Sequence, residues 1–464
     1  MRVGSIIEER GENWFRPARP WPHPGVLSGW QRLKALKSNL ISVFVQSDYA
    51  TGNDAGRLLS RQVVLLNEPE TIKHVLVTNH ENYERKSAQM RRALVHLVGE
   101  GLLISDGELW EHRRALVSDL VHRRRMNSFG KSMEAAAADM IVRWVSRGTG
   151  HTLDASQEMA ELAADTITRA IFGQVLQSEP RRQVVAGFTQ FQKLVDTVNV
   201  GFFFGADKGW PVFRGPTIRQ ALKKIHGVID AVVEANFSQE QTSESAISFL
   251  QQRQKRSPEL RLDLAALKSE AATLFMAGHE TAATTMTWAW YLLANAPWVE
   301  EAVHREVQAV VGGRAPTVED VPKLRWCRAV VEETLRLYPP IPILPRQAKD
   351  SDRIADISVE PEALVIVVPW LLHRSEDIWD RAHDFLPERF LGENKPVPYT
   401  YIPFSTGPRV CPGSTFGLTE AILCIATVAQ RFKLRVPAGH KVVPFCKLSL
   451  RPLGGLPVQL EARS

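Results

Sequence analysis

The stretch FSTGPRVCPGSTFG, from Phe404 to Gly417, places a cysteine in a tightly constrained turn. Cys411 follows Gly-Pro-Arg and precedes Pro-Gly, and an apolar-periodic run predicts a helix that begins at about Gly413. Arg409 and the unpaired N–H groups at the start of that helix would favour the thiolate form of the cysteine. The glycines would let backbone and a flat ligand approach closely. The pattern predicts a metal-binding thiolate, against the alternative of a core cysteine in a turn.

The fixed positions of this loop are Phe404-x-x-Gly407-x-Arg409-x-Cys411-x-Gly413. They resemble the haem-binding loop of the cytochrome P-450 superfamily, in which one cysteine thiolate is the axial ligand of the iron. The resemblance implies that haem b is the cofactor and that Cys411 is its proximal iron ligand. It also implies that Arg409 pairs with a haem propionate and that Phe404 packs beside the thiolate.

An E-x-x-R pair precedes the cysteine loop. Glu333 and Arg336 are three residues apart, which places both charges on one helical face. Alone, the pair is better explained as a solvated surface pair. The order of this pair, of Arg389 in Phe385–Phe390 and of Cys411 is similar to that in the family. By that resemblance, Glu333, Arg336 and Arg389 are expected to form a structural triad.

The sequence Ala277-Gly278-His279-Glu280-Thr281 lies midway along the longest expected helix. Glycine and threonine are poor choices for a helix interior, and a threonine hydroxyl can bond back to the carbonyl four residues earlier. The segment resembles the family motif whose acid and alcohol relay protons during oxygen activation. Glu280 and Thr281 would take those catalytic positions, and Ala277 would face the haem. The alternative is a helix that merely crosses the core.

Three further positions resemble those that hold the haem propionates in the family. Trp110 and Arg114 are four residues apart and share one face of an expected helix. Arg346 follows Pro345, beyond the helix that carries Glu333. An indole N–H and guanidinium groups both suit a carboxylate. The alternative for each arginine is a place on the solvated surface.

The periodicity predicts a mainly helical protein with a smaller β-rich lobe. A long helix is expected from about Asp263 to Ala296, which would span roughly 50 Å, and strands are expected from Ile354 to Pro369. The resemblance implies the cytochrome P-450 fold, a single large domain over residues 1–464 with haem between the long central helix and the cysteine loop. We expect an irregular amino-terminal segment over residues 1–60 and the core over about 61–460.

The 464 residues are 44% hydrophobic and 23% charged, which is typical of a globular protein with a large core. A net charge of +6 over this length gives no reason to expect a nucleic-acid partner. No run approaches the ~18 apolar residues of a membrane span, and the charged amino terminus has no signal-peptide pattern. We expect a cytoplasmic protein without a transmembrane segment, with peripheral contact at a membrane left open.

The function implied by the resemblance is that of a haem-thiolate monooxygenase, which hydroxylates or epoxidises a lipophilic small molecule with dioxygen and two externally supplied electrons. Since no Gly-rich dinucleotide fingerprint is present, we expect the electrons from a ferredoxin or flavodoxin-type donor with an NAD(P)H-dependent reductase. Arg113 and the run Arg123–Arg125 are candidates for docking such acidic carriers, or they form a solvated charge run.

Two other classes of function stay open. A haem-thiolate isomerase or dehydratase would need no external electrons, and the Glu280–Thr281 pair argues against it. A non-catalytic haem sensor is the second, and the interrupted long helix argues against that. The substrate is less defined. Val200–Gly205 (VGFFFG), Phe188 and Phe191 lie where the family has its access lid. They favour a terpenoid, a fatty acid or an aromatic polyketide, unless they are simply core residues.

Overall fold

The computed structural model describes residues 6–121, 126–173, 178–195, 200–204, 215–237, 246–257, 262–393 and 395–463. The helices of this part are α1 (Gly29–Ser38), α2 (Pro69–Lys73), α3 (Ala88–Val98), α4 (Gly107–Leu120), α5 (Met126–Arg147), α6 (Ala155–Phe172), α7 (Ser178–Leu194), α8 (Val200–Phe203), α9 (Pro216–Phe237), α10 (Ala246–Arg256), α11 (Leu264–Ala294), α12 (Pro297–Val311), α13 (Arg325–Leu337), α14 (Pro369–Leu372) and α15 (Ser414–Ala429). Shorter helical turns include η7 (Val318–Lys323) and η8 (Pro387–Phe390).

The strands are β1 (Ile6–Gly11), β2 (Trp14–Pro20), β3 (Asn53–Leu58), β4 (Arg61–Leu66), β5 (Thr152–Asp154), β6 (Leu344–Gln347), β7 (Asp352–Ile354), β8 (Ile357–Val359), β9 (Leu364–Val367), β10 (Phe432–Arg435), β11 (Pro444–Cys446), β12 (Leu450–Pro452) and β13 (Pro457–Ala462). The elements form one mainly helical domain with a smaller β-rich part, as the sequence predicts.

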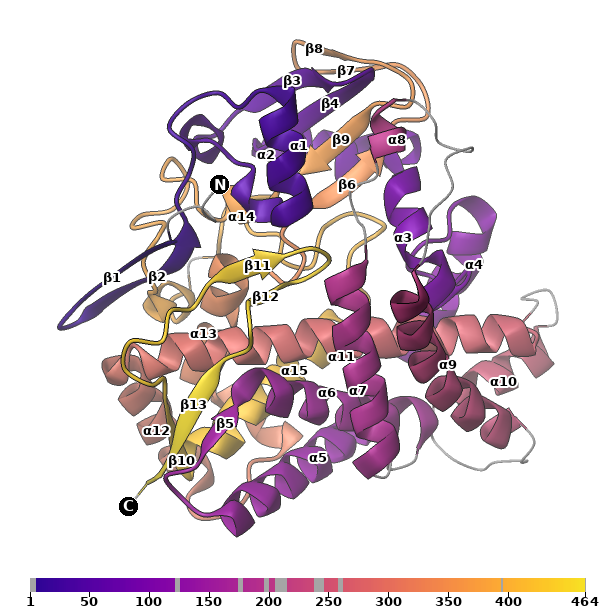
Figure 1. The fold of residues 1–464 in the computed structure, drawn as a ribbon. Coiled ribbons are helices and arrows are strands. Elements are labelled where there is room, and N and C mark those ends of the chain that lie inside the picture. The colour runs from indigo at the N-terminus through magenta and orange to yellow at the C-terminus, as the bar shows by residue number, and fades with distance from the viewer. Residues whose placement is uncertain are drawn as a thin grey trace.

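Helix α11 is the central element of the helical part. It is 31 residues long, and the Asp263 side chain caps its first turn by accepting the Ala266 N–H at 2.8 Å. Figure 1 shows α11 crossing the helical part, and α6, α13 and α15 pack against it. Most of its residues are buried, as expected of a helix that is apolar on nearly all sides. The long helix predicted from the sequence is confirmed within two residues of its bounds.

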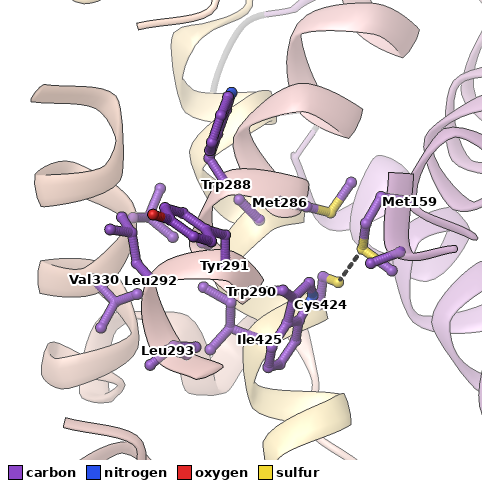
Figure 2. Close-up of a cluster of buried hydrophobic side chains, with 14 of the residues drawn as sticks. Met159, Met286, Trp288, Trp290, Tyr291, Leu292, Leu293, Val330, Cys424 and Ile425 are labelled. Atoms are coloured by element: carbon purple, nitrogen blue, oxygen red, sulfur yellow. Dashed lines mark hydrogen bonds between the residues drawn. The ribbon is translucent and has the colours of Figure 1, made fainter. Parts of the chain in front are cut away.

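Helix α15 begins at Ser414, and Gly413 is its N-cap residue. Its apolar surface continues into the core between α11 and α6. There the sulfur of Cys424 lies 3.5 Å from that of Met159, close to Trp290 (Figure 2). Cys424 is 1% exposed, so it is a core residue. Cys411, by contrast, lies just before the helix start and is exposed.

The β-rich lobe is built around a four-stranded sheet in the order β3-β4-β9-β6. The β4–β9 pair is parallel and the other two pairs are antiparallel. The sheet lies at the opposite end of the molecule from α5 and α10 (Figure 1). Strand β6 carries Arg346, which is paired with Val365 of β9 and only 3% exposed. The sheet therefore holds a buried cation.

The expectation of an irregular segment over residues 1–60 is wrong for its described part. Strands β1 and β2 form an antiparallel hairpin, and Ser28 caps α1 in a capping box with Gln31. Prolines are compatible with β2 because β1–β2 is a two-stranded sheet, in which each strand has a free edge. The hairpin is anchored at Ala18, whose N–H donates to Tyr291 and whose carbonyl accepts from Tyr338. Such distant partners are not visible in the local pattern.

No helix in the described ranges combines the length and the apolar character needed to cross a bilayer.

Glu420 on α15 gives the fold a pH dependence. It is 3% exposed, and burial raises the pKa of its carboxyl to about 8, with Thr166 only partly offsetting this. Because the folded protein keeps the proton that the unfolded chain releases near pH 4.3, the free energy of unfolding should fall as pH rises from about 4.3 to about 8.

We expect Glu420→Gln to remove this decline and to be more stable than the parent by a few kcal/mol at pH 8, at about 1.4 kcal/mol per pKa unit. Urea unfolding from pH 5 to pH 8 measures the free energy of unfolding of both proteins. Glu301→Gln, at an exposed position of α12, is the matched control. Parallel stability curves for the parent and Glu420→Gln would contradict the expectation.

Candidate functional site

The cysteine loop is closed by its own backbone. The Cys411 N–H donates to the Phe404 carbonyl at 2.9 Å, and the Val410 N–H donates to the Gly407 carbonyl at 3.0 Å. Gly407 has φ of 73°, and a Cβ there would lie 1.9 Å from the carbonyl oxygen of Leu76. Only glycine fits this position, for both reasons. The loop is therefore held against the segment that follows α2.

The Cys411 thiol is influenced by two opposing effects. The surrounding loop and helices raise its pKa, because they would desolvate the thiolate. The Gly413 N–H at the start of α15 and the Arg114 guanidinium lower it, but by less. The nearby cation is thus Arg114 rather than the Arg409 suggested by the sequence. The thiolate needs a further positive charge to become the stable form, and a metal ion supplies such a charge.

Cations gather beside this loop. Arg114 of α4 donates to the Val410 carbonyl at 2.7 Å. Arg409 stacks over Trp110, with its guanidinium carbon 4.3 Å from the ring centre, and donates to the Ser105 carbonyl at 3.1 Å. Trp110, Arg114 and Arg409 are therefore brought together, as the sequence predicts. Helix α4 presents the first two on one face.

The same cluster contains a cation that sequence reasoning missed. Burial, Arg346 and Arg409 together hold the pKa of Lys86 well below its usual range. Burial and Arg409 lower the pKa of Arg346 to about 10. Asp106 is the main opposing charge, and it lies 3.4 Å from Arg409. Lys86 belongs to no motif, and only its position two residues before α3 marks it.

The cations and the thiol at this site suit a haem. Burial lowers the pKa of all three cations, and repulsion from neighbouring arginines lowers it further, so an additional pair of negative charges would stabilise them. Haem brings two propionates, and the exposed Cys411 sulfur is a suitable axial ligand. Charge and ligand chemistry thus agree.

Helix α11 contributes the acid and alcohol residues. Ala277 is exposed although its neighbours Met276 and Phe275 are buried, so it borders open space in the middle of the helix. The Thr281 hydroxyl donates to the Ala277 carbonyl at 2.6 Å. Glu280 turns to another face, where it accepts hydrogen bonds from Ser449 and Arg451. The acid and the alcohol are adjacent in sequence but bonded to different partners.

Glu333, Arg336 and Arg389 are in direct contact. Arg336 donates two 2.7 Å hydrogen bonds to the Glu333 carboxylate, and both side chains are 0% exposed. Arg389 of η8 donates to the same carboxylate at 3.2 Å. Arg336 also donates to the carbonyls of His373, Ala382 and Asp384. The Glu333 carboxylate and the Arg336 guanidinium thus both have hydrogen-bond partners in the core.

The match to known families decides the identity. The family model described as Cytochrome P450 matches residues 34–457. The chain belongs to the cytochrome P450 family. A P450 of this family is a haem b monooxygenase, which takes electrons from a redox partner and acts on lipophilic molecules with dioxygen. The resemblance found in the sequence is therefore confirmed.

Among curated relatives, this P450 is 31% identical over 403 residues to cyclooctatin synthase of Streptomyces melanosporofaciens, covering 85% of each chain. It is 28% identical to a cytokinin hydroxylase of Arabidopsis thaliana, covering 85% of this chain and 78% of the relative. It is also 28% identical to germacrene A hydroxylase of Barnadesia spinosa, covering 82% and 78%. The crystal structure of the cytochrome P450DA haem domain has the same fold, with a TM-score of 0.81 at 20% identity over 96% and 98%.

Two sequence-based interpretations need correction. Arg113 is 6% exposed and lies 3.3 Å from the buried Glu270, so it is not available to dock an electron carrier. The run Arg123–Arg125 lies outside the described residues.

Phe188 and Phe191 are each 1% exposed, and Phe188 stacks on Phe275 with ring centres 5.4 Å apart. These phenylalanines are core residues and say nothing about the substrate.

Glu333→Ala should leave Arg336 and Arg389 without their shared counter-charge. Stranding a buried charge in this way costs about 3–5 kcal/mol. We therefore expect little haem-loaded protein, measured as Soret absorbance per milligram, and a lower urea midpoint. Glu388→Ala, at an exposed position beside Arg389, is the matched control and should load normally. A normal yield and a full haem spectrum from Glu333→Ala would argue against the triad.

Proposed function

We propose that this P450 hydroxylates or epoxidises a terpenoid. Relatives named for cyclooctatin and germacrene A, aligned over more than four fifths of the chain, carry this proposal. Germacrene A is a terpenoid hydrocarbon, and a saturated or olefinic skeleton of that kind offers no ionisable group to bind. Fatty acids and aromatic polyketides are the competing classes. Family membership favours a monooxygenase over an isomerase, a dehydratase or a haem sensor.

In this proposal, Cys411 holds the haem iron, and Trp110, Arg114, Arg346 and Arg409 hold the propionates, with Lys86 as a further cation. Bound haem supplies the redox chemistry that activates dioxygen. The supporting contacts are the stacking of Arg409 on Trp110 and the burial of Arg346. Phe404 packs against the main core and bonds through its carbonyl to Cys411, which would keep the sulfur in place.

Thr281 and Glu280 would handle protons. The Thr281 hydroxyl, bonded to the Ala277 carbonyl, lies beside the open space that Ala277 borders, where it can hold a water or pass a proton. The Glu280 carboxylate lies on the same turn of α11 as Thr281. Its pKa is lowered by Arg451, His279, Ser449 and Gln192, which together outweigh burial. An ionised acid next to an alcohol can accept a proton from solvent and return it.

The electron donor we propose is a ferredoxin or a flavodoxin-type protein with an NAD(P)H-dependent reductase. The net charge of +6 favours an acidic carrier. A cytoplasmic location fits such donors and remains a prediction, as does contact with a membrane.

The carbon monoxide difference spectrum of the reduced protein tests whether Cys411 is the iron ligand. We expect a Soret band at the position specific for thiolate-ligated haem, and its loss in Cys411→Ser with haem still bound. Cys424→Ala, which alters a core cysteine, is the matched control and should keep the band. A thiolate-type band in Cys411→Ser would exclude Cys411 as the ligand.

Spin-state titration tests the substrate class. We expect farnesol and geranylgeraniol to shift the Soret band of the oxidised protein at concentrations about tenfold lower than lauric acid or anthracene. Ten-fold corresponds to about 1.4 kcal/mol of binding free energy. Product analysis after turnover with NADPH should then find one added oxygen. Tighter binding of lauric acid or anthracene would move the assignment to a fatty acid or an aromatic substrate.

A further inference from the structure

Three buried aromatic rings are in contact where α11 meets the end of α13. Trp288 and Tyr291 of α11 are three residues apart, and their ring centres are 5.6 Å apart. Tyr338, which follows α13, stacks nearly parallel on Trp288 with ring centres 3.9 Å apart. The Tyr291 and Tyr338 rings are in edge contact, with centres 6.1 Å apart. Trp288, Tyr291 and Tyr338 form what we call the ring cluster, and each is at most 1% exposed.

Helix α11 connects the ring cluster to the haem side of the molecule. Trp288 follows Thr281 by two helical turns, so the two residues lie on one face of the helix, about 10 Å apart along its axis. Ala277 lies on the same face one turn earlier and borders open space. In the P450 fold the haem lies between the long central helix and the cysteine loop. Trp288 is therefore on the face of α11 that carries the proposed haem-side residues.

Tyr291 differs from the other two rings in having a base at its hydroxyl. The hydroxyl donates to a carboxylate oxygen of Glu8 at 2.5 Å and accepts the Ala18 N–H at 2.9 Å. Glu8 lies in β1, and its side chain is 25% exposed and paired with Arg10. Burial, with Tyr338 and Glu8, holds the pKa of Tyr291 well above its usual range, so the phenol keeps its proton until it is oxidised. Glu8 can then accept that proton and exchange it with solvent.

Tyr338 lacks such a base. Its hydroxyl donates to the Ala18 carbonyl at 2.6 Å, and a backbone carbonyl does not take up a proton near pH 7. The guanidinium carbon of Arg374 lies 5.6 Å from the Tyr338 ring centre, and its positive charge opposes the removal of an electron from that ring. Because an oxidised phenol must lose its proton to become a stable radical, Tyr291 is the favoured place for a missing electron.

A second group of rings adjoins the cluster, but a cation lies over it. The Trp370 ring centre is 6.4 Å from that of Tyr338, and the Trp370 indole N–H donates to Tyr49 at 3.0 Å. The guanidinium carbon of Arg374 lies 3.4 Å from the Trp370 ring centre. Burial lowers the pKa of Arg374 to about 9, which leaves it charged at pH 7. This charge disfavours oxidation of Trp370, so a missing electron moves to Tyr291 instead.

We propose that the ring cluster protects the enzyme when dioxygen is activated and no substrate is present to be oxidised. Trp288 gives one electron to the oxidant that remains at the haem. Tyr291 gives one electron to Trp288, and the Tyr291 O–H bond breaks as its proton moves to the Glu8 carboxylate. A one-electron reductant in solution, such as ascorbate, then reduces the Tyr291 radical, and the proton returns from Glu8.

Two such rounds, with two protons from solvent, reduce one activated oxygen atom to water and leave the ring cluster unchanged. This protective role rests on the monooxygenase activity of the family and not on the class of substrate.

Formation of the radical can be tested without a redox partner. The oxidised, haem-loaded protein is mixed with m-chloroperbenzoic acid and no substrate, frozen within milliseconds and studied by electron paramagnetic resonance. We expect a tyrosyl signal in the parent, identified by the change in its hyperfine splitting when ring-deuterated tyrosine is incorporated. Tyr291→Phe and Trp288→Phe should each lose most of that signal. Trp290→Phe, in the same helix but beside Cys424 (Figure 2), is the matched control and should keep it.

Glu8→Gln separates the role of a base from that of a hydrogen-bond partner. The amide oxygen can still accept the Tyr291 O–H, so the contact is retained, but an amide is too weak a base to take up the proton. We expect the tyrosyl signal to fall several-fold. Glu9→Gln, at the next and exposed position of β1, is the matched control and should keep the parent signal. A full signal in Glu8→Gln, or an equal fall in both variants, would overturn the role of Glu8.

Tyr49→Phe tests the choice between the two groups of rings and should leave the signal unchanged. Loss of the signal in Tyr49→Phe but not in Tyr291→Phe would overturn the assignment to Tyr291. A parent that shows the thiolate band and reacts with the peracid but forms no tyrosyl radical overturns the protective path and leaves the proposed function intact. A parent without the thiolate band overturns the proposed function, and the protective role with it.

Survival of the haem tests the protection itself. NADPH is oxidised with a ferredoxin and its reductase in the absence of substrate, and the Soret absorbance lost per NADPH consumed is measured with and without ascorbate. We expect this loss to be several-fold greater in Tyr291→Phe than in the parent, and ascorbate to reduce it in the parent alone. A merely structural effect of the substitution would not remove the response to ascorbate. Equal losses in the two proteins, or an equal effect of ascorbate on both, would overturn the protective role.

Discussion

The buried pairing of Arg336 with Glu333 is the interaction on which the position of the cysteine loop depends. Arg336 binds the carboxylate in a bidentate manner and also the carbonyl of His373. His373 in turn accepts the Ile402 N–H through Nε2 at 2.9 Å, two residues before Phe404. A guanidinium has enough donors to join one helix to several loop carbonyls at once. A long segment without regular structure thereby acquires a fixed conformation.

The haem site depends on charges that are costly when alone. Arg346, Arg409 and Lys86 come from three separate segments, and burial together with repulsion from neighbouring arginines lowers the pKa of all three. The cysteine loop shows the same principle, since the protein around the Cys411 sulfur desolvates its thiolate and raises the pKa. One ligand that carries a metal cation and two carboxylates would offset both of these costs. The site is thus complementary to haem in charge.

Much of this could be predicted from the sequence, for physical reasons. Helices α11 and α15 and strand β4 follow from local periodicity, and Cys411, Arg409, Trp110 and Arg114 from fixed spacings that the structure brings together. Features that depend on distant partners could not be predicted. Strand β2 forms although it contains prolines, because Ala18 bonds to α11 and to Tyr338. Lys86 and the burial of Arg113 likewise depend on segments far away in sequence.

The parallel pairing of β4 with β9 joins Val63–Leu66 to Leu364–Val367, about three hundred residues apart in the chain. Gly407 likewise packs on the carbonyl of Leu76. During synthesis, amino-terminal segments leave the ribosome first, so β4 must wait for most of the chain before it finds its neighbour. Closing so long a loop is slow. The segments that form the haem site can therefore come together only after the cysteine loop has been made.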